Sequence, residues 1–162
     1  MKMTAQWLTL WDREELSDEV LADQAKELVS TRDGARGFFV TAMTSDIPLL
    51  DRLPEALLLS LRQVGEEVVH LTTQNLAMSA AMACHHQRSG DLESMADSER
   101  VMLRSSELLR QLEPNLVKQH LERLLEGTEG QGEYAAFMER NNYEQIHRKA
   151  IAGAIFRVAE KA

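Results

Sequence analysis

The chain has 162 residues and a formal net charge of −8, from 18 basic and 26 acidic residues. This length suits one domain whose core needs neither disulfides nor a structural metal, so we expect residues 1–162 to form a single domain. The negative balance repels phosphate backbones and anionic lipid, and no dense run of Lys and Arg offsets it. The composition therefore excludes nucleic acid as an expected partner.

The single cysteine, Cys84, excludes an intramolecular disulfide. The longest apolar runs are too short to span a membrane. Residues 1–11 lack the apolar core and the small-residue cleavage site of a signal peptide. We therefore expect no membrane association and a cytoplasmic location.

The N-terminal third predicts a strap followed by two helices. Residues 1–11 carry both tryptophans in a polar setting, and we expect them to lie across the helices as a strap. Asp12, with Glu15 three residues later, matches a capping box, so a helix is expected over residues 12–30. After a turn, a short apolar helix is expected over residues 38–45.

A long central helix over residues 54–88 is expected to organise the fold. This stretch has one internal glycine, Gly65, and its apolar side chains recur at helical spacing. The recurring residues are Leu57, Leu61, Val64, Val68, Leu71, Met78 and Met82. Pro54 suits the first helical turn, and Gly90 suits the end of the helix.

The C-terminal half predicts four more helices. Apolar spacing places them over residues 92–112, 114–127, 133–140 and 143–160. The short break at Gly90 makes the first of these an antiparallel neighbour of the central helix. No segment alternates convincingly with period two. The sequence therefore predicts an all-α fold, a single helical bundle of about five to seven helices around the central helix.

Three stretches carry a resemblance to a known family: ARGFFVTAMTSD (35–46), NLAMSAAMA (75–83) and SERVMLRSSELL (98–109). There the chain resembles an uncharacterised helical protein family of cyanobacteria, over roughly the middle half of its length. That family has no assigned activity. The resemblance thus implies a helical, cytoplasmic bacterial protein and carries over no catalytic residue.

Two Glu-x-x-His pairs are the candidates for metal chemistry: Glu67 with His70, and Glu144 with His147. A separation of three residues places both side chains on adjoining parts of one helix face, so that a carboxylate and an imidazole can share a metal ion. Ferritin-like di-metal proteins use two such pairs, together with a lone glutamate on each of two other helices.

Glu27 and Glu99 supply the lone glutamates in the required chain order. The candidate ligands of a di-iron or di-manganese site are Glu67, His70, Glu99, Glu144 and His147. Other interpretations remain open. Glu144 also suits a helix N-terminus, and His147 also suits a core histidine bonded to a carbonyl. Glu67 also suits a solvated face.

Cys84, His85 and His86 form another cluster near the end of the central helix. Adjacent helical residues point about 100° apart, so the three side chains cannot all bind one ion from a regular helix. Histidines near a helix C-terminus interact favourably with its dipole, and we prefer this interpretation.

The hypothesis we prefer is a small helical protein with an interaction or regulatory role and no cofactor, rather than an enzyme. The di-metal carboxylate protein is the alternative. The small-residue run Ala77–Ala83 and the short helix Phe38–Met43 are candidates for a surface shared with a protein partner or, in a homodimer, with a second copy of the chain.

Overall fold

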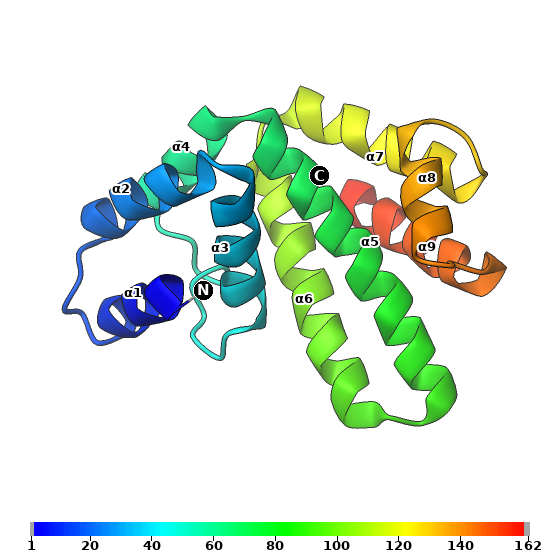
Figure 1. Cartoon of the computed structure of the whole chain (residues 1–162), viewed down its shortest axis with the longest axis horizontal. Coiled ribbons are helices and arrows are strands. Elements are labelled where there is room, and N and C mark those ends of the chain that lie inside the picture. Colours follow the sequence, from blue (N-terminus) through cyan, green and yellow to red (C-terminus); the bar gives the residue numbers. More distant parts are fainter. Residues whose placement is uncertain (1, 161–162) are drawn as a thin grey trace.

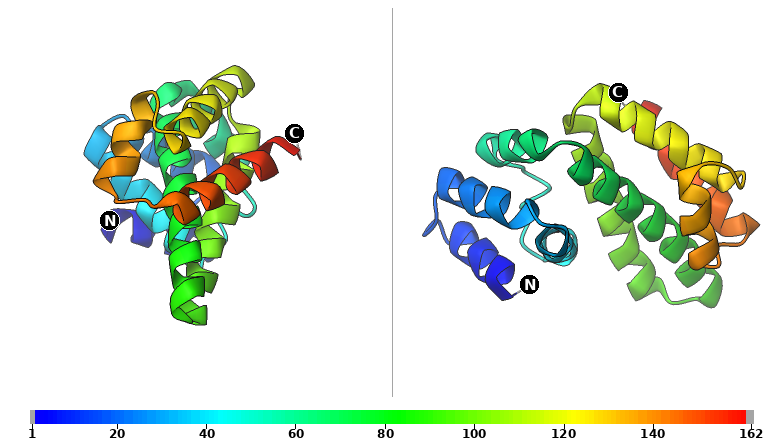
Figure 2. Two further views of the ribbon diagram at one scale, coloured as in Figure 1. Left: turned by 90° about the vertical axis from the view of Figure 1, so that its right-hand side faces the viewer. Right: turned by 45° about the horizontal axis from the view of Figure 1, so that its top comes forward.

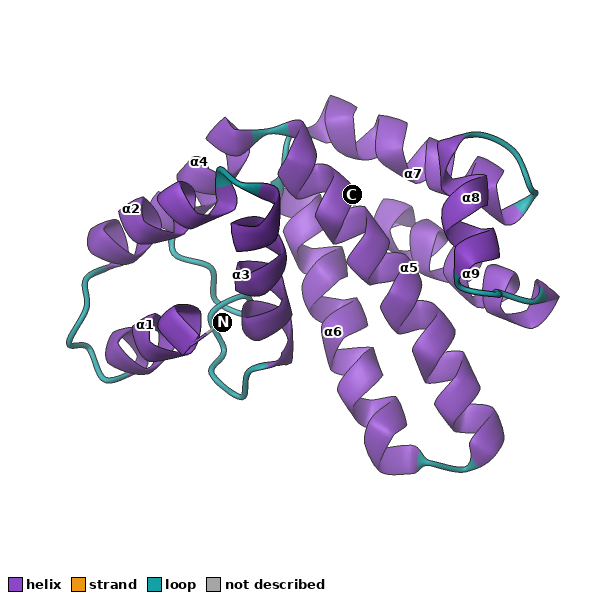
Figure 3. Ribbon diagram, viewed as in Figure 1, coloured by secondary structure: helices purple, strands orange, loops and turns teal. Residues whose placement is uncertain are grey.

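The computed structural model describes the backbone of residues 2–160, and the side chains of residues 4–160, as an all-helical fold (Figures 1 and 3). Nine helices and no strand occupy this part of the chain. Their bounds are α1 (Lys2–Asp12), α2 (Asp18–Val29), α3 (Arg32–Thr44), α4 (Glu55–Val64), α5 (Glu66–Ser89), α6 (Leu92–Gln111), α7 (Pro114–Thr128), α8 (Glu133–Arg140) and α9 (Gln145–Glu160). The all-α fold class is confirmed, whereas the expected number of five to seven helices was too low.

The expected long helix over residues 54–88 is two helices, because the chain turns at Gly65. Gly65 has φ 84° and ψ −126°, a backbone conformation that a side chain strongly disfavours. α4 ends where the Gly65 N–H donates to the Leu61 carbonyl, and α5 begins at the next residue, Glu66. The internal glycine was therefore the signal of a break that the apolar spacing concealed.

The N-terminal segment is a helix, α1, rather than a strap. Asp12 is the last residue of α1 and does not start a helix, contrary to its spacing from Glu15. α2 begins instead at Asp18, where the Ser17 side chain accepts a hydrogen bond from the Val20 N–H. A single serine thus supplied the cap that the expected pair of acidic residues did not.

α3 begins before the expected start at Phe38. Thr31 caps it by accepting a hydrogen bond from the Gly34 N–H at 3.1 Å, so the expected turn forms the first turns of a helix. From α6 onward the bounds lie within a few residues of those expected. α7, for example, extends one residue beyond Gly127, its expected last residue.

The α5–α6 hairpin lies between two groups of helices (Figure 2). α1 to α4 pack with one another on one side, and α3 joins this group to α6. α7, α8 and α9 cover the other side, where α9 packs on both α5 and α6 and α7 packs on α5 and α8. α5 and α6 are antiparallel, as the short connection at Gly90 predicted.

The core extends through both groups but does not reach the closed end of the hairpin. Leu57, Leu61 and Leu71 of the expected central seam are buried. Met78 and Met82 continue that seam toward the closed end, which projects beyond the neighbouring helices, and they remain 44% and 41% exposed. Within the described residues, no helix combines the length and the apolar character needed to cross a membrane.

Candidate functional site

The structure places the two Glu-x-x-His pairs at opposite ends of α5. Glu67 and His70 lie in its first turns. Ile146, which precedes His147, contacts the other end: its carbonyl lies 3.9 Å from the Cys84 Sγ. Cys84 follows His70 by fourteen residues, which corresponds to about 21 Å along a helix. The pairs therefore do not surround one centre.

Each histidine of these pairs has another partner. The Nδ1 of His70 lies 2.9 Å from the hydroxyl of Tyr134. The Nδ1 of His147 accepts a hydrogen bond from the Glu144 backbone N–H at 3.0 Å. This second contact supports the interpretation of Glu144 as the start of a helix, whereas the His147 Nδ1 bonds to an N–H rather than to the expected carbonyl.

The lone glutamates of the di-metal hypothesis lie apart as well, since Glu27 is exposed on α2 and Glu99 is exposed on α6. Among the residues that the structure describes, no three His, Cys, Asp or Glu side chains form a group that could hold a metal ion. The di-metal hypothesis thus stays a prediction without support from the geometry.

The two segments expected to form a shared surface are buried only in part. Ala77, Ala80 and Ala81 are at most 3% exposed, since α6 and α9 pack on α5. Phe38 and Phe39 are at most 1% exposed, with their ring centroids 5.2 Å apart and the edge of one ring toward the face of the other. Met78 and Met82 of the first segment and Val40 of the second remain 44%, 41% and 48% exposed, so a shared surface at these segments stays a prediction.

Four polar side chains meet between α5, α7 and α8. The hydroxyl oxygen of Tyr134 lies 2.9 Å from the Nδ1 of His70 and 2.9 Å from the Nδ1 of His120. The Nε2 of His120 lies 3.2 Å from a carboxylate oxygen of Glu66. Tyr134 and His120 are buried, whereas His70 is partly exposed and Glu66 is exposed. We call these four residues the histidine–tyrosine chain.

Local sequence explains why α7 and α8 place these groups together. His120 lies on the buried side of α7, one turn before the fully buried Leu124. Gly127 lets α8 approach closely, because a Cβ atom there would lie 2.8 Å from the Cβ of Tyr134. A glycine inside a helix therefore serves the close packing of α7 on Tyr134.

Burial affects the acidity of two members of the histidine–tyrosine chain. It lowers the pKa of His70, while the Glu67 carboxylate opposes this shift and His120 reinforces it. Burial also raises the pKa of the Tyr134 hydroxyl above its usual range, so this group stays neutral and keeps a proton to donate. Both pKa shifts favour uncharged side chains at His70 and Tyr134 near neutral pH.

His120 and Tyr134 were not predicted as site residues. Each is a polar side chain on the apolar side of a helix: His120 lies between Leu116 and Leu124, and Tyr134 precedes Phe137. That pattern was a usable signal for buried polar groups. It could not show that the two residues contact each other.

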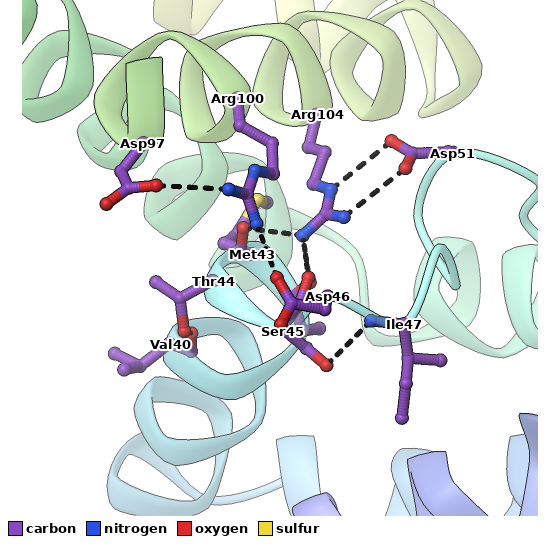
Figure 4. A network of polar contacts seen from close by, with 11 residues as sticks. Val40, Met43, Thr44, Ser45, Asp46, Ile47, Asp51, Asp97, Arg100 and Arg104 are labelled. Atoms are coloured by element: carbon purple, nitrogen blue, oxygen red, sulfur yellow. Dashed lines mark hydrogen bonds and ion pairs between the residues drawn. The ribbon is translucent and has the colours of Figure 1, made fainter. Parts of the chain in front are cut away.

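A second buried polar cluster surrounds Arg104 of α6 (Figure 4). Its Nη1 donates to the carbonyls of Met43 and Ser45, at 2.8 and 2.6 Å. Its Nε and Nη2 donate to the two carboxylate oxygens of Asp51, at 3.2 and 3.3 Å. Arg104 thereby pairs carbonyls at the end of α3 and joins the N-terminal group of helices to α6.

An apolar groove of about 810 Å³ runs between α7, α9 and the end of α6. Its apolar lining includes Leu112, Val117, Leu121, Leu125, Ile155 and Phe156. The Phe156 side chain is 53% exposed. The volume lies within the range of about 300–1,000 Å³ typical of ligand sites, and such sites are usually lined by apolar side chains.

One wall of the groove is a regular row of side chains on α7. Val117, Leu121 and Leu125 follow one another at four-residue intervals. Such a row forms a ridge along a helix, here about 12 Å long. The polar lining consists of Arg110, Lys118 and Glu122, and Arg110 pairs with Glu107 of its own helix.

The comparisons with known proteins agree with the resemblance of the central stretches. No curated protein matches the chain. No solved structure matches it either. The family described as "Uncharacterised conserved protein UCP020893" matches residues 1–158, and this description names neither an organism nor an activity. Because the match spans both groups of helices, the chain belongs to this uncharacterised conserved family.

Proposed function

We propose that this protein acts through interaction, by binding an amphipathic helix of another protein in the groove between α7 and α9. The observation that carries the proposal is the apolar groove beside the half-exposed ring of Phe156. Full burial of a large apolar side chain contributes about 1.5–3 kcal/mol, and a partner that covers Phe156 would gain binding free energy of this kind.

The shape of the groove suits a helix. The row of Val117, Leu121 and Leu125 offers a ridge of about two helical turns, and helices pack by fitting such ridges into grooves. A partner helix would place apolar residues at positions i, i+3, i+4 and i+7 against this row. Phe156 would then lie against the same apolar face.

The charges around the groove favour a partner with acidic flanks. Lys118 supplies a cation at the rim that an acidic flank can meet, whereas Arg110 already pairs with Glu107 of its own helix. A second copy of the chain would bring the same net negative charge and would be repelled. These charges support a helix from a different protein over a homodimer.

Calorimetry with two synthetic helical peptides of about 15 residues tests the proposal. Both peptides carry the same leucine stripe, but one has Glu and the other Lys on its flanks. We expect the Glu-flanked peptide to bind about tenfold more tightly. Phe156→Asp should abolish binding without unfolding the protein, because the ring is already half exposed.

Leu92→Asp is the matched control. Leu92 is 66% exposed and lies on α6 about 25 Å from the groove residue Leu109, so its variant should bind like the wild type. Failure of both peptides would overturn the proposal. So would binding of decanoate alone, which would indicate a small-ligand site, or a wild-type dimer that Phe156→Asp dissociates in sedimentation, which would indicate a second copy.

A further inference from the structure

We propose that the histidine–tyrosine chain of Glu66, His70, His120 and Tyr134 is a proton-controlled latch that holds α7 and α8 against α5 and sets the affinity of the groove. The effect on the groove rests on the proposed function. The latch itself rests only on the geometry of the four residues.

A single hydroxyl lies between two ring nitrogens in this latch. The Tyr134 hydroxyl has one proton, so it donates to one Nδ1 and accepts from the other. With both histidines neutral, the Nδ1–H of His70 donates to Tyr134, and Tyr134 donates to the Nδ1 of His120. The Nε2–H of His120 then donates to Glu66. Every contact within the latch is satisfied.

A first added proton preserves these contacts. On His70, it occupies the second ring nitrogen of a partly exposed side chain. On His120, it reverses the direction of donation, so that His120 donates to Tyr134 and Tyr134 donates to His70. The latch therefore accepts one proton without losing a hydrogen bond.

A second proton does break the latch. Both Nδ1 atoms then donate to the one Tyr134 oxygen, and the Tyr134 hydroxyl loses its histidine acceptor and has to turn toward the side chain of Thr73. Two cations also face each other, because the ring centroids of His70 and His120 lie 5.8 Å apart. The latch thus holds while at most one histidine is charged.

Charged groups face the latch from each helix packed around it. α5 contributes Glu66 and Glu67, and α3 contributes Arg32, whose charge acts on His70. Arg123 of α7 lies 3.8 Å from Glu66 and 3.3 Å from Glu133 of α8. Three carboxylates against two guanidinium groups leave one excess negative charge, which supports one bound proton rather than two.

α7 links the latch to the groove because it carries a residue of each on different faces. His120 contacts Tyr134 and Glu66, whereas Val117 and Leu121 line the groove. Loss of the His120 contacts frees α7 to move relative to α9, which forms the opposite wall. Acidification through the range in which the second histidine is protonated should therefore weaken binding in the groove.

An NMR titration of the histidine rings from about pH 8 to about pH 5 tests the latch directly. The exposed His85 serves as an internal reference. We expect only one of the rings of His70 and His120 to take up a proton while the fold stays native. Independent titration of both rings in a protein that keeps its native spectrum would overturn the latch.

The pH dependence of unfolding gives a second measurement. The lowered pKa of His70 means that the unfolded chain binds more protons as the pH falls below about 6.5, so native stability declines there. The unfolding equilibrium constant should rise by up to about tenfold per pH unit for each extra proton. His70→Gln should flatten this slope, and His85→Gln should not; equal slopes in both variants would contradict the latch.

The link to the groove is tested by titrating the Glu-flanked peptide at about pH 7.5 and about pH 5.5. Wild-type affinity should fall at the lower pH, whereas His70→Gln should keep most of its affinity. Equal wild-type affinity at both values would overturn the link but not the latch. Absence of binding at either value would overturn the proposed function and the link, while the ring titration still decides the latch.

Discussion

Arg104 and His120 are both 2% exposed, and each joins helices that are distant in the sequence, yet the two junctions differ in kind. Arg104 keeps its charge at any physiological pH and has only donors, which carbonyls and Asp51 accept. His120 has ring nitrogens that either donate or accept, and its partner Tyr134 does both. The first junction is therefore permanent, and the second depends on protons.

The position of each junction matches this difference. Arg104 ties the N-terminal group of helices to α6, so its loss would separate two parts of the core. The histidine–tyrosine chain ties α7 and α8 to α5, next to the groove. A permanent contact thus holds the fold together, and a conditional contact lies where a change in shape would affect binding.

Loss of the permanent junction should have the largest effect. We expect Arg104→Met to lower the free energy of unfolding by about 3–5 kcal/mol, because it leaves buried carbonyls at the end of α3 unpaired. Urea unfolding measures the change. Arg100→Met is the control, since Arg100 pairs with exposed Asp46 and should contribute at most about 1 kcal/mol. Similar losses of unfolding free energy in both variants would contradict the distinction between the buried junction at Arg104 and an exposed ion pair.

The conditional junction should depend on the close approach of α7 and α8. We expect Gly127→Ala to lower the free energy of unfolding by about 1–3 kcal/mol, because the new Cβ would meet Tyr134 at 2.8 Å. Gly153→Ala on α9 is the control. Its Cβ would meet nothing within 4 Å, so it should be neutral or stabilising by up to about 1 kcal/mol. Thermal and urea unfolding measure both variants. Equal free energies of unfolding would show that small movements of α7 and α8 relieve the contact with Tyr134.

The smallest effect is expected from removing a Glu-x-x-His pair, and the quantity measured is the metal content of the protein. His70 belongs to the latch and His147 to a helix start, so we expect protein purified without added metal to hold little iron or manganese. Elemental analysis should not distinguish the wild type from the Glu144→Ala, His147→Ala double variant. Near-stoichiometric metal that the double variant loses would instead support the di-metal hypothesis.

Local patterns predicted the later helices well and the earlier ones poorly. α6 has its apolar residues at helical spacing, and a glycine precedes it, so its bounds followed from a few neighbouring residues. The break at Gly65 was missed because apolar residues at helical spacing continue on both sides of it. α1 was missed because it packs against α2 and α3, and such contacts cannot be inferred from neighbouring residues in the sequence.

The candidate site was less predictable than the fold. The sequence singled out His70, but it offered Glu67 as the partner, whereas the structure pairs His70 with Tyr134. Arg104 was overlooked, because apolar spacing located the helix over residues 92–112 without indicating that a charged side chain on it would be buried. Each error concerns which residues meet, and none concerns fold class.

By itself the sequence determined that this protein is helical, where its last four helices lie, and that its net charge is negative. Apolar spacing, caps and composition act over a few residues, so one sequence suffices to infer them. Only the tertiary structure decided which polar side chains meet in the interior and where an apolar face stays open. The pairs Arg104 with Asp51, His120 with Glu66, and His70 with Tyr134 span 53, 54 and 64 residues, so their contacts depend on how the helices pack.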